Sequence, residues 1–377
     1  MKLPDYYGGS ILNLMASIEN ALGGRSIYPE LKMLPSSELM GKTIVLMIID
    51  GLGFDYLKKH RCILHKGLRG NITSVFPSTT TAAITTFMTG MAPQQHALPG
   101  WFTYLKEVRD VAVVLPFTSR ATGEPLKKAG ITLESIIDAL PVSKRIQFPS
   151  IYISKKELAR SAYTRAMKFS KRIGVSNFRE FISRVGREII SKRPKLIVAY
   201  WPEFDSACHT HGVGSRQALL VFKKIVSGVK QLEKHISSNS VLIVTADHGL
   251  IDSKKTIILN EHPEILECLS QPLCGETRVA YCYVRKSKAR EFEHRIKKKL
   301  GRYCEIYKSS EILRRHFFGP FAPSRRLRGR IGNYVLIMKD SYTIRDFLSE
   351  DEKNTVLIGN HGGVSRTEMY VPLIVFK

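Results

Sequence analysis

Four short hydrophobic runs recur along the chain, and each ends abruptly in polar residues. The runs are rich in Val, Ile and Leu and show no alternation of apolar and polar positions. Unbroken runs of this kind are typical of strands that are buried on both faces of a parallel sheet. The predicted strands, with their polar ends, are TIVLMIIDG (43–51), KLIVAYWPEFD (195–205), VLIVTADHG (241–249) and TVLIGNHGG (355–363).

The segments between these runs show helical periodicity. Residues 214–236 are the clearest example, because their apolar side chains recur at spacings of three and four. Alternation of strands and helices predicts an α/β fold with a doubly wound, mostly parallel central sheet flanked by helices. Ligands bind such sheets outside the carboxyl ends of the strands, which is where the polar residues of this chain stand.

Residues 276–345 have a different character. A strand-like run at 278–284, a charged helical stretch at 288–301 and a second apolar run at 333–338 predict a small α+β subdomain. We therefore expect a core domain made of residues 1–275 and 346–377. The basic segment would be inserted before the last strand of that core.

The net charge of +25 is unusually large, and about half of it is concentrated in one region. Between Arg278 and Asp340 the chain has 18 Lys or Arg against 5 Asp or Glu. This excess is explained either by a solvated basic face or by an electrostatic funnel for a polyanion such as a nucleotide or nucleic acid. The sequence leaves both explanations open.

The chain carries no run long enough to cross a membrane as a helix, which takes about 20 apolar residues. Its first residues do not resemble a secretory signal, since an Asp, a Pro and two Gly interrupt them. We therefore expect a cytoplasmic protein without a membrane association. The six cysteines show no paired metal-binding pattern, and free thiols are expected in a reducing compartment.

The polar ends of the four predicted strands contain side chains that bind divalent metals. Carboxylates and neutral imidazoles suit zinc and similar ions, and three of each are enough for two sites. Asp205 and His209 are four residues apart, so a helix would place both on one face. Two neighbouring metal ions are a recurrent solution for cleaving phosphate esters. The candidate ligands are Asp50, Asp205, His209, Asp247, His248 and His361.

The stretch FPSTTT (76–81) places four hydroxyl side chains directly before an apolar segment. The spacing of the apolar residues after it predicts a helix, so the hydroxyls would stand at a strand-to-helix corner. A helix N-terminus favours anions, and a metal-activated hydroxyl there would serve as a nucleophile. Simple capping of the helix is the alternative explanation. The apolar positions are Ile84, Phe87, Met88 and Met91.

Taken in order, these motifs resemble those of the type I phosphodiesterase/nucleotide pyrophosphatase family, within the alkaline phosphatase superfamily. The resemblance extends from about residue 43 to the C-terminus and includes FFGP (317–320) and VPLIV (371–375). The motifs that carry it are DG at 50–51, FPSTTT followed by TG at 89–90, DxxxHxxG at 205–212, DHG at 247–249 and HGG at 361–363.

The resemblance implies two divalent metal ions, Zn²⁺ in the first place, with Mn²⁺ or another divalent ion as the alternative. One ion would be held by Asp205, His209 and His361. The other would be held by Asp50, Asp247, His248 and the nucleophile. Counting nine residues back from Thr89 selects Thr80 as that nucleophile, while Thr79 and Thr81 are its alternatives if the register differs.

Two positions depart from the pattern of nucleotide-cleaving relatives. Those relatives place an Asn three residues after the nucleophile and an aromatic residue directly after it, where this chain has Ala83 and Thr81. Tyr200 retains the other position that stacks on a base. Trp101 and Tyr104 are candidates for a replacement apolar wall, or they are ordinary packing aromatics.

The sequence thus predicts a two-metal hydrolase that cleaves phosphodiester or phosphoanhydride bonds through a covalent Thr80 intermediate. The substrate would be a small phosphate ester, with a nucleotide as one candidate. A phosphomonoesterase, a phosphonate hydrolase or a phosphotransferase would use the same scaffold. A nucleic-acid-binding protein with a vestigial metal site is the alternative from another class.

Overall fold

Strand β1 (Thr43–Ile49) lies in the middle of a seven-stranded sheet and is buried along its whole length. The computed structural model describes residues 1–190 and 193–377. Strands β9 and β8 pair with β1 in parallel on its two sides, while β18 is antiparallel to its neighbours. In order across the sheet, the strands are β2 (Leu68–Thr73), β18 (Tyr370–Phe376), β9 (Ser240–Thr245), β1, β8 (Leu196–Trp201), β6 (Ser150–Lys155) and β7 (Lys171–Val175).

The predicted α/β fold with a mostly parallel central sheet is confirmed, and three of the four predicted strands are its adjacent central strands. The fourth prediction was wrong. Within 355–363 only β17 (Gly359–Asn360) is extended, and it pairs with the two-residue strand β10 (Ile251–Asp252) outside the central sheet. The apolar side chain of Val356 is 76% exposed, so this run is not a buried strand.

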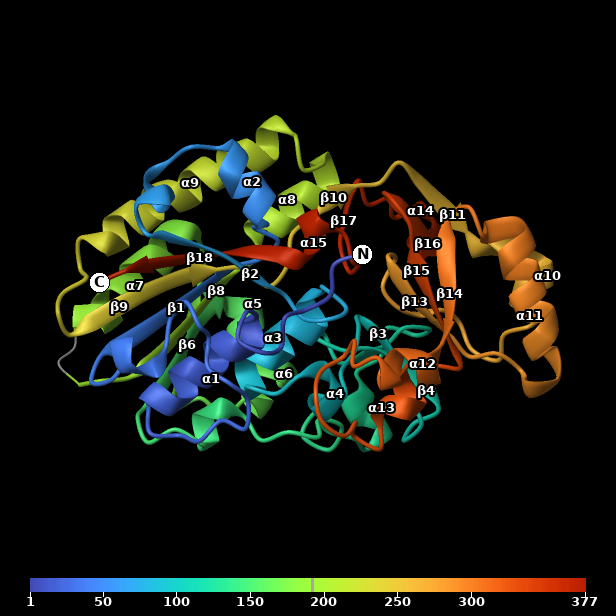
Figure 1. Ribbon diagram of the computed structural model, residues 1–377, viewed down its shortest axis with the longest axis horizontal. Coiled ribbons are helices and arrows are strands. Elements are labelled where there is room, and N and C mark those ends of the chain that lie inside the picture. The colour runs from blue at the N-terminus through green and yellow to red at the C-terminus, as the bar shows by residue number, and fades with distance from the viewer. Residues whose placement is uncertain (191–192) are drawn as a thin grey trace.

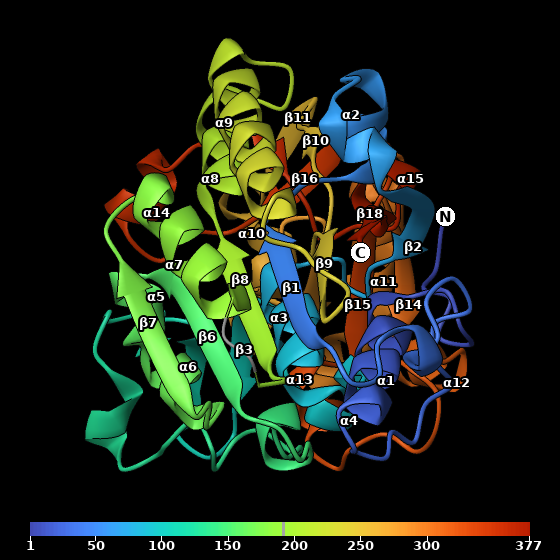
Figure 2. The ribbon, with the colours of Figure 1, turned by 90° about the vertical axis from the view of Figure 1, so that its left-hand side faces the viewer.

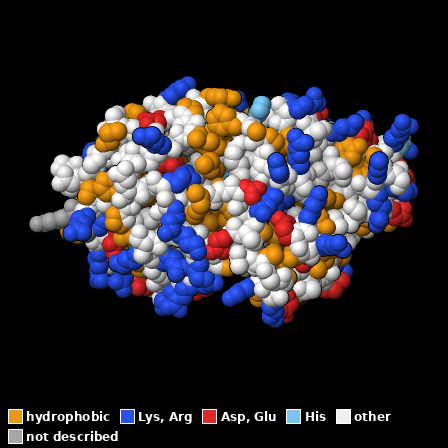
Figure 3. Space-filling model, turned by 90° about the horizontal axis from the view of Figure 1, so that it is seen from below, with side chains coloured by type: hydrophobic (Ala, Val, Ile, Leu, Met, Phe, Trp, Pro, Cys, Tyr) orange, Lys and Arg blue, Asp and Glu red, His pale blue; other side chains and the backbone are white. Residues whose placement is uncertain are grey.

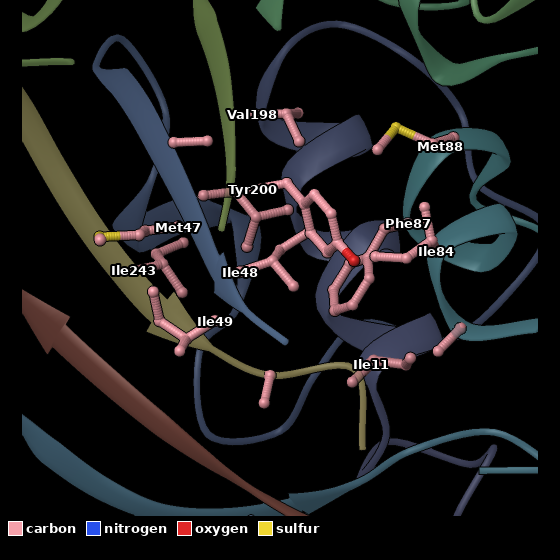
Figure 4. Close-up of a cluster of buried hydrophobic side chains, with 14 of the residues drawn as sticks. Ile11, Met47, Ile48, Ile49, Ile84, Phe87, Met88, Val198, Tyr200 and Ile243 are labelled. Carbon is pink, nitrogen blue, oxygen red and sulfur yellow. The ribbon is translucent and has the colours of Figure 1, made fainter. Parts of the chain in front are cut away.

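Helices cover both faces of the central sheet (Figures 1 and 2). One face carries α2, α7 and α9, and the opposite face carries α1 and α3. Figure 4 shows side chains of β1, β8 and α3 packed together between the sheet and this second helical layer. The bounds are α1 (Ile11–Ala21), α2 (Phe54–Lys59), α3 (Thr80–Thr89), α7 (Phe178–Ile190), α8 (Glu203–His211) and α9 (Arg216–Glu233), the last agreeing with the predicted helix at 214–236.

A second seven-stranded sheet lies beside the first (Figure 1). It is antiparallel where its strands pair, and it combines strands from two distant parts of the chain. Its strands, in order, are β14 (Cys304–Lys308), β15 (Tyr334–Met338), β13 (Val279–Cys282), β12 (Cys274–Gly275), β3 (Phe102–Leu105), β4 (Asp110–Val113) and β5 (Thr118–Ser119).

The helices around the second sheet are short: α10 (Pro263–Leu266), α11 (Ala289–Arg295), α12 (Ser309–Arg314) and α13 (Leu327–Arg330). The expected insert at 276–345 therefore provides only β13, β14 and β15, while β12 and the strands within 102–119 complete the sheet. The proposed division of the chain at these boundaries stays a prediction. Phe76 packs edge-on against Phe317 and Phe318, so the FPSTTT corner contacts the part of the chain that surrounds the second sheet.

Basic side chains are spread widely over the surface, as Figure 3 shows for one face. They also gather around a cavity of about 740 Å³ at the end of the second sheet. Its lining contains no carboxylate and includes Lys286, Lys308, Arg314 and Arg328. The polyanion explanation of the charge is compatible with this cavity and stays a prediction. Among the described residues, no helix combines the length and apolar character needed to cross a membrane.

Candidate active site

The carboxyl ends of β1, β8 and β9 deliver most of the predicted ligands to one place. Asp50 directly follows β1, where Gly51 turns the chain with a φ of 74°. A side chain at Gly51 would collide with Leu250, because a Cβ built there lies 2.4 Å from its Cδ1. Asp247 accepts hydrogen bonds from the backbone N–H groups of Gly51 and His248, at 3.1 and 3.0 Å. This arrangement holds two carboxylates side by side in the buried interior.

Helix α8 follows β8 and presents Asp205 and His209 on one face, as predicted. The Nε2 of His209 lies 3.2 Å from one carboxylate oxygen of Asp205. His361 reaches the other oxygen of Asp205 from the loop after β17, at 3.9 Å. Its ring stacks on that of His248 with 3.8 Å between the ring centroids.

These residues form two overlapping groups that share His248. The first contains Asp50, Asp247 and His248, and the second contains Asp205, His248 and His361. Within each group the ligand atoms lie within 4.8 Å of one another. The predicted ligands therefore converge, and His209 stands next to the second group through Asp205. Which residues bind which ion stays a proposal.

The chemistry of this cluster fits a bound cation. Buried carboxylate oxygens of Asp50, Asp205 and Asp247 have no hydrogen-bond partner among the residues that the structure describes. Burial, and then the carboxylates of Asp247 and Asp205, raise the pKa of Asp50 well above its ordinary value. Crowding of acidic groups without a counter-charge is costly, and divalent cations remove that cost.

The orientation of the histidines fits the same conclusion. The Nδ1 atoms of His209 and His248 lie 2.7 and 3.2 Å from the backbone carbonyl oxygens of Gly359 and Gly249. Since a carbonyl only accepts, a hydrogen bond at either position requires a proton on Nδ1, and a neutral ring then keeps a lone pair on Nε2. Burial, and then the rings of His248 and His209, hold the pKa of His361 well below its ordinary value. Neutral imidazoles of this kind are metal ligands.

Thr80 is the first residue of α3, and it is the threonine that meets this cluster. Its Oγ1 lies 3.0 Å from Nε2 of His248. The neighbouring threonines are placed differently: Thr79 donates to Glu276 at 2.6 Å, and the hydroxyl of Thr81 is buried without a partner. The first N–H groups of a helix have no partner within the helix, so the start of α3 also offers donors to an anion.

The predicted aromatic residues have different positions. Tyr200 donates a hydrogen bond to Asp50, and Figure 4 shows its ring beside Ile48, Ile84 and Phe87. Trp101 lines the cavity in front of Thr80, whereas Tyr104 packs edge-on against Tyr283 and does not line that cavity. The substrate-binding roles of these three aromatics stay proposals. Contact of Tyr200 with a candidate ligand was not anticipated.

Glu276 is a further residue of the site that sequence reasoning missed. Its Oε1 accepts hydrogen bonds from the hydroxyl of Thr79 and from the N–H of Trp101, at 2.6 and 2.7 Å. Burial raises its pKa to about 7. No local motif marks this residue, because it is brought to the site by the pairing of β12 with β3.

The HGG loop that carries His361 is held by a buried ion pair. Arg278, the residue directly before β13, binds both carboxylate oxygens of Glu368 at 3.0 Å, and Glu368 also accepts from the backbone N–H of Gly363 at 2.8 Å. Both charged side chains are at most 1% exposed. The segment that leads into β13 thus contributes directly to the position of the HGG loop.

Replacing Arg278 by Met is expected to lower the free energy of unfolding by about 3–5 kcal/mol, since it leaves Glu368 charged and unpaired in the interior. Urea denaturation of the two proteins gives the difference. The matched control is Arg315→Met, which breaks an exposed pair with Glu311 and should change stability by less than about 1 kcal/mol. Equal effects of the two substitutions would contradict the structural role of Arg278.

The fold and the site together define a phosphoester hydrolase of the alkaline phosphatase superfamily. Residues 44–364 match the Type I phosphodiesterase / nucleotide pyrophosphatase family, and the chain belongs to that family.

The thiols are free, as expected, at all six cysteines: 62, 208, 268, 274, 282 and 304.

Solved structures with the same fold include two proteins of different activity. Murine ectonucleotide pyrophosphatase/phosphodiesterase 5 is 19% identical, with a TM-score of 0.65 over 88% of this chain and 87% of that one. Phosphonoacetate hydrolase from Sinorhizobium meliloti, in complex with phosphonoformate, is 15% identical, with a TM-score of 0.64 over 89% and 90%. At these identities the likeness shows the fold alone. No curated protein sequence matches this chain.

Proposed function

We propose that this protein is a two-metal hydrolase that cleaves phosphodiester or phosphoanhydride bonds through a covalent intermediate on Thr80. The observation that carries the proposal is the position of the Thr80 hydroxyl, 3.0 Å from His248 at the edge of the ligand cluster. Thr80 lines a cavity together with Asp50, Asp205 and His361. A substrate in this cavity can therefore contact both the nucleophile and the ligand cluster.

The residues of the site would have three roles: nucleophile, metal ligand and hydrogen-bond donor to the phosphate. Asp50, Asp247 and His248 would hold one ion, with Thr80 beside it, and Asp205, His209 and His361 would hold the other. When bound, Zn²⁺, or Mn²⁺ as the alternative, would neutralise phosphoryl oxygens and lower the pKa of a coordinated hydroxyl or water. The N–H groups at the start of α3 would donate to a phosphoryl oxygen.

The reaction would take two displacements at phosphorus. In the first, the Thr80 oxygen forms a bond to phosphorus as the bond to the leaving oxygen breaks, and the leaving group departs with a proton. In the second, a water oxygen attacks the same phosphorus, the bond to Thr80 breaks, and the Thr80 hydroxyl regains its proton. The sum is hydrolysis of one ester or anhydride bond.

A diester is favoured over a monoester because, apart from the proposed metal ions, the site offers little to neutralise a second negative charge on phosphate. Ala83 has no donor where nucleotide-cleaving relatives have an amide, and Glu276 adds a carboxyl group to the cavity wall. A nucleotide is one candidate substrate, and the murine neighbour, in an inactive form, has been solved in complex with AMP.

The test compares a chromogenic phosphodiester, its monoester and phosphonoacetate, using protein stripped with a chelator and resupplied with Zn²⁺ or Mn²⁺. We expect metal-dependent hydrolysis with the highest kcat/KM on the diester. Preference for the monoester would change the function to a phosphatase, and preference for phosphonoacetate would change it to a phosphonate hydrolase. Undiminished activity after complete removal of the metals would contradict the two-metal mechanism itself.

A further inference from the structure

The cavity in front of Thr80 is large, about 840 Å³, which is the size of a site for a drug-sized molecule. Thr80, Asp50, Asp205, His209 and His361 occupy one part of its wall. A phosphate group attached to Thr80 would fill only a small part of this volume. The remainder is available to the group that the substrate carries on its phosphate.

The rest of the wall is mainly apolar, and its residues come from the regions of the central sheet and of the second sheet. Leu357 also lines the cavity and is 37% exposed, so the apolar wall reaches the surface there. Apolar walls stabilise a bound group in proportion to the apolar area that it removes from water. Side chains that contribute to the wall are Ile84, Trp101, Leu115, Leu158, Leu273 and Ile344.

The cations in the wall are already engaged. Arg120 pairs with Asp346 at 2.8 Å and with Glu352 at 3.0 Å, and it stacks 4.1 Å from the ring of Phe102. Lys155 pairs with Glu203 at 3.3 Å. Arg345 donates hydrogen bonds to two backbone carbonyl groups, those of Glu352 and Thr355.

These cations already bind acidic side chains or carbonyl groups. They therefore do not offset the acidic side chains of the wall when a charged ligand enters. Glu157 and Glu276 add further carboxyl groups to the lining. A substituent that carries additional phosphates or carboxylates would have to break existing ion pairs or lie next to acidic side chains. Either requirement costs binding free energy.

We propose that the cavity holds a bulky, uncharged and largely apolar substituent, so that the natural substrate is a phosphodiester of an alkyl or aryl alcohol. This inference rests on the proposed function and narrows it. It selects diesters over phosphoanhydrides such as dinucleotides and nucleoside polyphosphates, whose remaining phosphates would meet the acidic wall. The enzyme would cleave the ester bond while the apolar group anchors the substrate.

The experiment measures kcat/KM for a series of 4-nitrophenyl phosphodiesters whose second group is methyl, butyl, octyl or a carboxylate-terminated octyl chain. Each buried methylene should raise kcat/KM about fourfold until the cavity is full, and the octyl ester should exceed the methyl ester by at least about 100-fold. The carboxylate-terminated ester should fall at least about tenfold below the octyl ester.

Variants of the wall test the same point independently. Leu158→Lys or Leu115→Gln should lower the ratio of octyl to methyl kcat/KM by at least about tenfold, because each places a polar group in the apolar wall. Two positions are used so that one variant that fails to fold does not decide the result. The matched control is Leu220→Lys, an exposed leucine of α9 outside the cavity, which should leave the ratio unchanged.

Each outcome has a distinct meaning. Equal kcat/KM for methyl and octyl esters, or a preference for the carboxylate-terminated ester, would overturn the apolar cavity and leave the phosphodiesterase function intact. A ratio that falls in Leu220→Lys as much as in the wall variants would also overturn it. If the metal-loaded enzyme hydrolyses none of the diesters, the proposed function fails and this inference fails with it.

Discussion

Thr80→Ala is expected to lower kcat on a chromogenic diester by 10³-fold or more, on the order of the effect of losing a nucleophile in other hydrolases. The metal content should remain that of the wild type, because the carboxylates and imidazoles of the cluster do not depend on this hydroxyl. Parallel measurements of steady-state kinetics and metal content by elemental analysis separate these two effects. The wild type should also accumulate a modified threonine when acid-quenched during turnover.

The neighbouring threonines provide the controls. Thr81→Ala removes a buried hydroxyl that has no partner, and it should leave kcat within about tenfold of the wild type. Thr79→Ala releases Glu276 and tests that contact separately. Wild-type activity in Thr80→Ala would mean either that another residue is the nucleophile or that the reaction has no covalent intermediate.

His361→Ala is the second substitution with a large expected effect. It removes one of three protein ligands proposed for its ion, so metal affinity should fall by roughly 100-fold or more, and activity should fall with occupancy. Elemental analysis after dialysis against a series of buffered free-metal concentrations gives the affinity directly. Partial recovery of activity at high metal concentration is expected, since the nucleophile and the remaining ligands are intact.

The matched control for this experiment is His294→Ala, an exposed histidine of α11 that belongs to neither ligand group. Its metal affinity should equal that of the wild type. Unchanged metal affinity in His361→Ala would mean that the HGG loop does not provide a ligand. The role of the C-terminal motif would then be restricted to packing.

Local sequence was sufficient to predict the central strands, because continuous Val, Ile and Leu runs are typical of strands buried on both faces of a parallel sheet. It was also sufficient for the convergence of Asp50, Asp205 and Asp247, since neighbouring parallel strands end at the same edge. The same reasoning failed for 355–363. A run such as TVLI has strand-like residues, but Val356, Leu357 and Ile358 remain exposed, and β18 takes the position between β9 and β2.

The sequence by itself determined the fold class, the family and the set of candidate ligands, because each depends on residue types at short spacings along the chain. The resemblance selected Thr80 with Thr79 and Thr81 as alternatives, and the tertiary structure decided that Thr80 meets His248, since a helix rotates successive side chains by about 100° and packing selects the face. Only the tertiary structure brought Glu276 to Thr79 and Trp101, and paired Arg120 of the cavity with Asp346. Such contacts join residues far apart in sequence, and no local pattern encodes them.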